Sequence, residues 1–344
     1  MILIAVLFFI ALLASGVATF LRRATLDGMI ARNRDLTARS EALARGGVQL
    51  AIALLLQDRL DEAEEAPLDA RDDLWARIGE LELPVSDGGR LRLRIEDTGA
   101  RLNLNALFDE EGMADSDAEI FLTAFLEKVI GEIPPHQGER DYDPGELAKN
   151  LIDYVDTDDV EPDGEREDDY YQLQQPAYRA ANRPLFSLDE LGLVEGFDRV
   201  LVDAIRPYAT VYPYARGAES DPNAEDGIGV NPNTAPAHVL ALLFHGMAPD
   251  RNLASEKDVR WILKTRSDGR VFCPKSDSYG DLECELLSDE TGAALVGIYP
   301  PPRYTANVFQ VSAEAGYGDV RRTVEAIIDR SKPKTPLILS WRVR

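Results

Sequence analysis

The sequence predicts an α+β fold in which a large all-α domain is inserted into a small α/β domain. A helical pattern of apolar residues runs from residue 1 to about residue 59. Strands with a period of two follow at 90–97 and return at 307–313 and 319–330. The segment between them has the pattern of helices separated by proline- and glycine-rich turns. A chain of 344 residues exceeds what one hydrophobic core usually organises, which agrees with several domains.

The first helix begins with a segment that is long and apolar enough to cross a membrane. Residues 1–21 carry no charge, and their polar side chains are those of Ser15 and Thr19. At about 1.5 Å rise per residue, such a helix spans the apolar core of a bilayer. A secretory signal peptide is the first alternative, but no basic region precedes Ile2. A buried helix of a soluble domain is the second, although so long an apolar run is rare there. We predict a transmembrane part at residues 1–21.

The remaining chain divides into a discontinuous α/β domain and an insertion. The helix continues beyond the membrane segment, and Gly46-Gly47 is where we expect it to loosen. The two strand-rich parts, 22–102 and 303–330, are predicted to pair around this helix. Residues 103–302 form the predicted insertion, with two small bundles in tandem. Its expected helices are 117–130, 146–154, 188–191, 199–205, 235–243 and 255–264.

Composition excludes several classes of function. The net charge of −24 opposes general nucleic-acid binding, which needs basic groups to replace phosphate counterions. With three histidines, the chain has too few to build a histidine-rich transition-metal site. The sequence contains no G-x-S-x-G, H-E-x-x-H or G-x-x-x-x-G-K-[ST] motif, so no catalytic signature is visible.

One acidic segment stands out as a candidate cation site. From Asp156 to Asp169, nine of fourteen residues are carboxylates. Such a cluster repels itself, and Ca²⁺ relieves this repulsion because it takes six to eight oxygen ligands from flexible loops. The spacing departs from an EF-hand, since Glu161 occupies the position of the turn glycine. The alternative is a loop whose charges are simply solvated.

Two segments resemble helix-hairpin-helix modules, which in other proteins grip nucleic-acid backbones. In Leu188-x-x-Leu-Gly-Leu-Val-Glu-Gly, the hairpin offers glutamates where phosphate binding needs Lys or Arg. Ser187, three residues before Glu190, has the spacing of a capping box. In the second segment, we expect Asn233 or Thr234 to cap a helix that opens near Pro236. Plain capping accounts for both patterns.

The two cysteines, Cys273 and Cys284, flank a polar loop of ten residues. In an oxidising compartment, a disulfide closing this loop would contribute roughly 2–3 kcal/mol. Two buried free thiols are the alternative. The pair favours a location outside the cytoplasm.

Together, these residues resemble the K-type minor pseudopilins of the bacterial type II secretion system. The similarity covers most of the chain. The segments that carry it are the apolar N-terminus, Arg45-Gly-Gly-Val, Leu102-Asn-Leu-Asn-Ala-Leu, Leu151-Ile-Asp-Tyr-Val-Asp-Thr-Asp, Glu167-Asp-Asp-Tyr-Tyr, Asn182-Arg-Pro-Leu-Phe-Ser-Leu-Asp-Glu-Leu and Val230-Asn-Pro-Asn-Thr-Ala-Pro.

This resemblance implies a pilin-like α/β domain with an inserted α-domain. It also implies a place at the tip of a periplasmic pseudopilus, in complex with I-type and J-type minor pseudopilins. The protein would cross the inner membrane once, with its C-terminal part in the periplasm. One or two calcium ions are implied, and their ligands carry over to Asp156, Asp158, Glu167 and Asp168, with Glu165 and Asp169 as further candidates.

The start of the chain gives a further expectation about assembly. Prepilins carry a short basic leader that is cut after a glycine, and Met1 is expected to be the first residue after this cleavage, with a misassigned start as the alternative. Residue five is then Ala5, whereas most pilin-like subunits have a glutamate there that neutralises the N-terminal amine of the next subunit towards the tip. A carboxylate in lipid without its partner is costly. Alanine therefore suits a subunit that has no neighbour above it.

We predict a structural assembly protein without catalysis. The alternative is a membrane-anchored helix-hairpin-helix receptor for nucleic acid, which the net charge of −24 opposes. A third hypothesis, an anchored calcium-dependent hydrolase, lacks a visible nucleophile and base.

Overall fold

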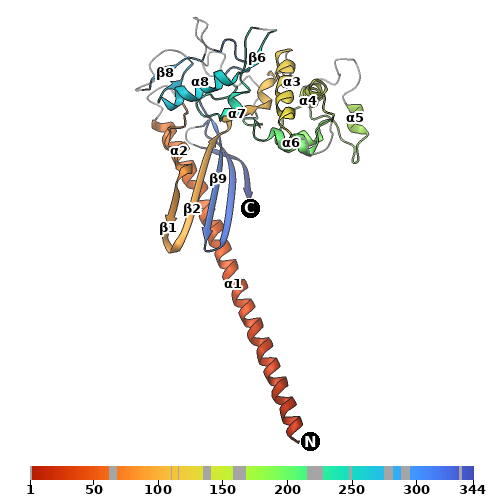
Figure 1. Ribbon diagram of the computed structural model, residues 1–344, viewed down its shortest axis with the longest axis vertical. Coiled ribbons are helices and arrows are strands. Elements are labelled where there is room, and N and C mark those ends of the chain that lie inside the picture. The colour runs from red at the N-terminus through yellow and green to blue at the C-terminus, as the bar shows by residue number, and fades with distance from the viewer. Residues whose placement is uncertain are drawn as a thin grey trace.

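In the computed structural model, a long stem helix carries a head made of a sheet and a helical part (Figure 1). The stem emerges below the sheet, and the helical part lies above the sheet's opposite end. The structure describes residues 2–61, 68–109, 111–114, 116–134, 141–157, 168–214, 228–247, 250–274, 282–287, 295–332 and 335–344.

The stem is helix α1, Ile2–Asp61. Its first half is exposed, while Ala44, Val48 and Leu55 are buried against the sheet. The predicted loosening at Gly46-Gly47 is wrong, because the helix is continuous there. Gly47 instead permits close packing: a Cβ atom at this position would lie 2.8 Å from Leu91 Cδ1.

The sheet has the strand order β1-β2-β9-β10-β11, and all neighbouring strands are antiparallel. Its central pair joins distant parts of the chain, since Leu93 of β2 lies opposite Ala313 of β9. The face towards α1 is apolar and holds an edge contact between Trp75 and Phe309, whose ring centroids are 5.0 Å apart. The strands are β1 (Glu82–Val85), β2 (Gly89–Asp97), β9 (Val308–Tyr317), β10 (Val320–Asp329) and β11 (Leu337–Val343). Strand β11 lies outside the predicted ranges 22–102 and 303–330.

Between β2 and β9, the described chain builds a second core around short helices. The α-helices are α3 (Ser116–Gly131), α4 (Pro144–Val155), α5 (Asp168–Gln172), α6 (Arg199–Ile205), α7 (Ala237–Leu240) and α8 (Glu256–Ser267), while α2 (Leu74–Arg77) precedes the sheet. The 3-10 turns are η2 (Ile78–Glu80), η3 (Ser86–Gly88), η4 (Thr98–Ala100), η5 (Leu104–Leu107) and η7 (Leu188–Leu193). Three strand pairs that the prediction did not include are β3 (Leu102–Asn103) with β4 (Ala209–Thr210), β5 (Phe244–His245) with β6 (Asn252–Leu253), and β7 (Val271–Phe272) with β8 (Cys284–Glu285).

The expected helix at 235–243 is shorter, because the residues before it have other partners. Helix α7 follows Pro236, and no side chain caps it. Asn233 exchanges two hydrogen bonds with the backbone of Phe272, at 2.7 and 2.9 Å. Thr234 donates its hydroxyl proton to Asp97 over 2.7 Å. The capping prediction for Asn233 and Thr234 is therefore wrong.

The capping pattern at Ser187 precedes a 3-10 helix, where an α-helix was expected. The Ser187 hydroxyl accepts a hydrogen bond from the N–H of Asp189. Glu190 accepts one from the N–H of Phe186, one residue earlier than in a standard capping box.

Candidate functional site

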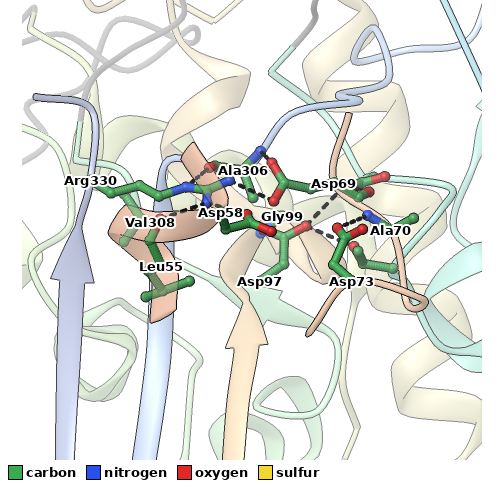
Figure 2. Close-up of polar contacts among 12 residues, drawn as sticks. Leu55, Asp58, Asp69, Ala70, Asp73, Asp97, Gly99, Ala306, Val308 and Arg330 are labelled. Atoms are coloured by element: carbon green, nitrogen blue, oxygen red, sulfur yellow. Dashed lines mark hydrogen bonds and ion pairs between the residues drawn. The ribbon is translucent and has the colours of Figure 1, made fainter. Parts of the chain in front are cut away.

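A buried polar network joins α1, the sheet and the helical part, and Arg330 is at its centre (Figure 2). The Arg330 side chain is 0% exposed and pairs at 2.6 Å with both Asp69 and Asp58. Its Nε donates to the carbonyl oxygen of Ala306, and its Nη1 donates to that of Leu55. One guanidinium therefore holds the end of α1, the segment that follows it and the entry to β9 together.

The network continues through Asp97 at the end of β2. This carboxylate accepts hydrogen bonds from the N–H of Gly99 at 2.6 Å, the Asn231 amide at 3.0 Å and the Thr234 hydroxyl at 2.7 Å. The Asn231 amide also donates to the carbonyl oxygen of Asp69, 3.3 Å away. Burial raises the pKa of the Asp97 carboxyl, and these donors act in the opposite direction. The segment Val230-Asn-Pro-Asn-Thr-Ala-Pro was noticed in the sequence as a helix cap. In the structure, it ties the helical part to the sheet through Asp97.

Asp73 adds a fourth carboxyl group to this junction. It accepts a hydrogen bond from the N–H of Ala70 at 2.7 Å, which closes the turn before α2. Burial is the main cause that raises the pKa of Asp73 to about 6; the nearby Asp58 acts in the same direction, and the hydrogen bond from Ala70 acts against both. The arrangement is suited to fixing two parts of the chain relative to each other, because Arg330 and Asp97 each bond to groups from other elements.

The candidate calcium ligands lie mainly beyond the described part of the chain. Asp158, Glu165 and Glu167 are outside it, and so are the side chains of Asp168 and Asp169, whose backbone begins α5. Within the residues that the structure describes, no group of three His, Cys, Asp or Glu side chains is placed to hold a metal ion.

Asp156, by contrast, is described, and it ends α4 with a buried side chain. The helices on either side of the acidic segment pack together through Tyr154 and Tyr171, whose ring centroids are 5.6 Å apart. The backbone N–H groups of Ala181 and Asn182 both donate to the carbonyl oxygen of Tyr154. The two ends of the segment are therefore anchored on the body of the helical part.

Cys273 and Cys284 form a disulfide, with 5.6 Å between their Cα atoms. The bond joins the end of β7 to β8, which run parallel. Cys273 is buried in the helical core, so the disulfide ties β8 to that core.

The apolar start of α1 is exposed along its whole length, including Ala5, and Met1 lies outside the described residues. Its most apolar window has a mean hydropathy of 2.7, and none of that window is buried. By length and composition, this helix is able to cross a membrane.

Comparison with known proteins gives one consistent result. The family model for protein K of the type II secretion system matches residues 100–214. Type II secretion system protein K of Pseudomonas aeruginosa is 30% identical over 301 residues, covering 84% of this chain and 76% of that protein. The protein of the same name from Aeromonas hydrophila is 26% identical, covering 90% of this chain and 86% of its own.

A solved structure supports the fold. The crystal structure of the GspK-GspI-GspJ complex from the enterotoxigenic Escherichia coli type 2 secretion system contains a chain with a TM-score of 0.59. At 19% identity, the match covers 91% of this chain and 99% of that one. The predicted α+β class is thereby confirmed. The chain belongs to the protein K family of the type II secretion system and is a minor pseudopilin of that system.

Proposed function

We propose that this protein caps the tip of the type II secretion pseudopilus as a structural component without catalysis. The observation that carries the proposal is the position of the helical part. The helical part is inserted between β2 and β9, and its described residues cover the end of the sheet opposite the stem (Figure 1). A further subunit of the same shape would meet this mass if it stacked in the direction of the head. Addition of further subunits above this head is therefore blocked, while the stem helix remains free to pack against the helices of the subunits below.

Ala5 is proposed to serve the same position, because its methyl group keeps the first turns of α1 apolar. A carboxylate at this depth in a membrane is costly unless an amine pairs with it.

The stem would hold the protein in the inner membrane before assembly, with the head in the periplasm. The Cys273–Cys284 disulfide agrees with this oxidising compartment. To test the role of the stem, a strain lacking the protein is complemented with the full chain, or with a chain whose residues 2–21 are replaced by a cleavable export signal. We expect only the full chain to restore export. Export restored by the head alone would contradict the anchoring role.

We propose the I-type and J-type minor pseudopilins as its partners, because the solved relative is part of a GspK-GspI-GspJ complex. Co-purification of the full chain with each partner, followed by measurement of the complex mass, tests this. The expected result is a complex with one copy of each protein. A full chain that remains alone in the presence of both would contradict it. The alternative of a nucleic-acid receptor has no support in the comparisons.

We also propose that calcium binds the acidic segment and locks the fold around α4 and α5. The candidate ligands are Asp156, Asp158, Glu165, Glu167, Asp168 and Asp169. The anchored flanks of the segment and the buried carboxylate of Asp156 support this, since a bound Ca²⁺ would neutralise charges that otherwise repel. Removing calcium with a chelator should lower the unfolding midpoint, and Asp156→Asn should reduce that shift. An unchanged midpoint would count against the site.

A further inference from the structure

A cleft of about 590 Å³ lies where α2, the end of β2 and the start of α7 meet. Strand β1 pairs with β2 only as far as Arg92, so α2 and η2 flank the following part of β2. The opposite wall comes from the helical part and includes Pro207, Pro236 and His238. This volume is typical of ligand-binding sites. Because Arg71, Arg94 and Arg101 line it, this cleft is called the arginine cleft below.

The arginine cleft reverses the charge of the protein locally. Three guanidinium groups line it, from Arg71, Arg94 and Arg101, whereas the chain as a whole has a net charge of −24. Glu96 is shared between two of them, at 2.5 Å from Arg94 and 3.2 Å from Arg101. The other lining carboxyl, Asp97, is buried and accepts hydrogen bonds from inside the junction. One half-buried carboxylate, with a side chain 29% exposed, therefore faces three cations.

Arg71 is held in place by a neutral group. Its Nε and Nη2 both donate to the carbonyl oxygen of Thr234, at 3.1 and 3.0 Å. In the described part of the chain, no carboxylate forms an ion pair with Arg71 within 4.0 Å. Burial lowers the pKa of Arg71, against the attraction of the more distant Glu96.

A second guanidinium behind Arg71 adds to this positive charge. Arg266 donates to the carbonyl oxygens of Pro232 and Ala235. Burial, and then repulsion by Arg71, lowers the pKa of Arg266 to about 10, while Asp72 acts in the opposite direction. A carboxylate entering the cleft would meet a fixed guanidinium whose charge is not yet paired, which is the geometry that arginine uses to bind carboxylates.

We propose that the arginine cleft binds an acidic segment of a partner protein. The cleft is many times larger than a single small anion, and the apolar surfaces of Ala76, Pro207 and Pro236 give an extended backbone a wall to pack on. Because the surface is acidic elsewhere, such a segment is attracted here and repelled by most of the remaining protein. This inference does not depend on the position of the protein at the tip.

The test uses the full chain in detergent and a fluorescently labelled hexaglutamate peptide, followed by fluorescence anisotropy at low ionic strength. We expect binding that weakens as salt is added, and no binding of labelled hexaglutamine. Arg71→Ala and Arg94→Ala should each weaken hexaglutamate binding by about tenfold, as expected when a charge-assisted hydrogen bond is lost. Arg94 is the safer variant for folding because its side chain is 69% exposed.

The matched control is Arg321→Ala. This arginine lies on the same sheet, is 71% exposed and pairs with Glu314 outside the cleft. Its removal should leave hexaglutamate binding unchanged. The proposal is overturned if the control weakens binding as much as Arg94→Ala, or if the peptide does not bind the unmodified chain. Displacement of the peptide by inorganic phosphate at equal concentration would also overturn it, because the cleft would then be a site for small anions.

Discussion

Replacing Arg330 by methionine removes a guanidinium that connects α1, the segment after it and the entry to β9. Both its side chain and that of Asp69 are 0% exposed, and they are 2.6 Å apart. In the variant, Asp69 keeps the hydrogen bond from the N–H of Ala306, but it loses its ion pair with the guanidinium of Arg330. Breaking a buried ion pair from one side typically costs about 3–5 kcal/mol. The stacking of Arg330 over Phe309, at 4.6 Å, is lost as well.

The predicted loss is measured as the free energy of unfolding in a denaturant titration of the full chain. In a thermal unfolding experiment, each kcal/mol lost lowers the midpoint by roughly 2–4 °C, so the thermal unfolding midpoint should fall by on the order of 10 °C. Arg321→Met is the control on β10, the strand that Arg330 directly follows, and because that side chain is 71% exposed, we expect a change within about 0.5 kcal/mol. Combining Arg330→Met with Asp69→Leu should recover part of the loss, since the buried charge of Asp69 is removed, while Asp58 and the N–H of Ala306 still lose their partners. An Arg330→Met variant within about 1 kcal/mol of the unmodified chain would refute this reasoning.

Three further predictions concern packing, the disulfide and pH. Gly47→Leu should destabilise the protein by about 1–3 kcal/mol in the same denaturant titration, because α1 would have to move away from the sheet. Gly46→Ala is the control. Because nothing lies within 4 Å of a Cβ atom at Gly46, this change should be neutral or slightly stabilising. Replacing Cys273 and Cys284 by alanine should cost about 3 kcal/mol by the same measure, and the double variant should no longer respond to a reducing agent. The folded-state pKa of Asp73, about 6, lies above its unfolded value, so this carboxyl makes the unmodified chain lose stability as pH rises from about 4 to 6. The stability of Asp73→Asn relative to the unmodified chain should therefore rise across that window, and a constant difference would contradict the assignment.

Regular periodicity is what made part of the fold predictable. Strand β2 alternates arginine with leucine and isoleucine, and the structure buries the apolar members on the face towards α1. The long helix was predicted from apolar spacing alone. The prediction that the helix loosens at Gly47 was wrong. From the sequence alone, a glycine that allows a helix to pack closely against a sheet cannot be distinguished from a glycine that interrupts the helix.

Interactions between distant parts of the chain could not be predicted in the same way. Arg330 and Asp69 are separated by 261 positions, and nothing in the local sequence of either marks them as partners. Asn233 and Thr234 have the composition of a helix cap, but tertiary partners use their polar groups instead. Strand β11 was missed because the prediction stopped at residue 330.

The central claim is that a subunit with this head ends the fibre. It is tested most directly by adding an epitope tag after Arg344, which is exposed, and locating the tag on isolated pseudopili by electron microscopy with gold-labelled antibody. The account predicts label at one end of each fibre and none along the shaft. Label distributed along the shaft would contradict it.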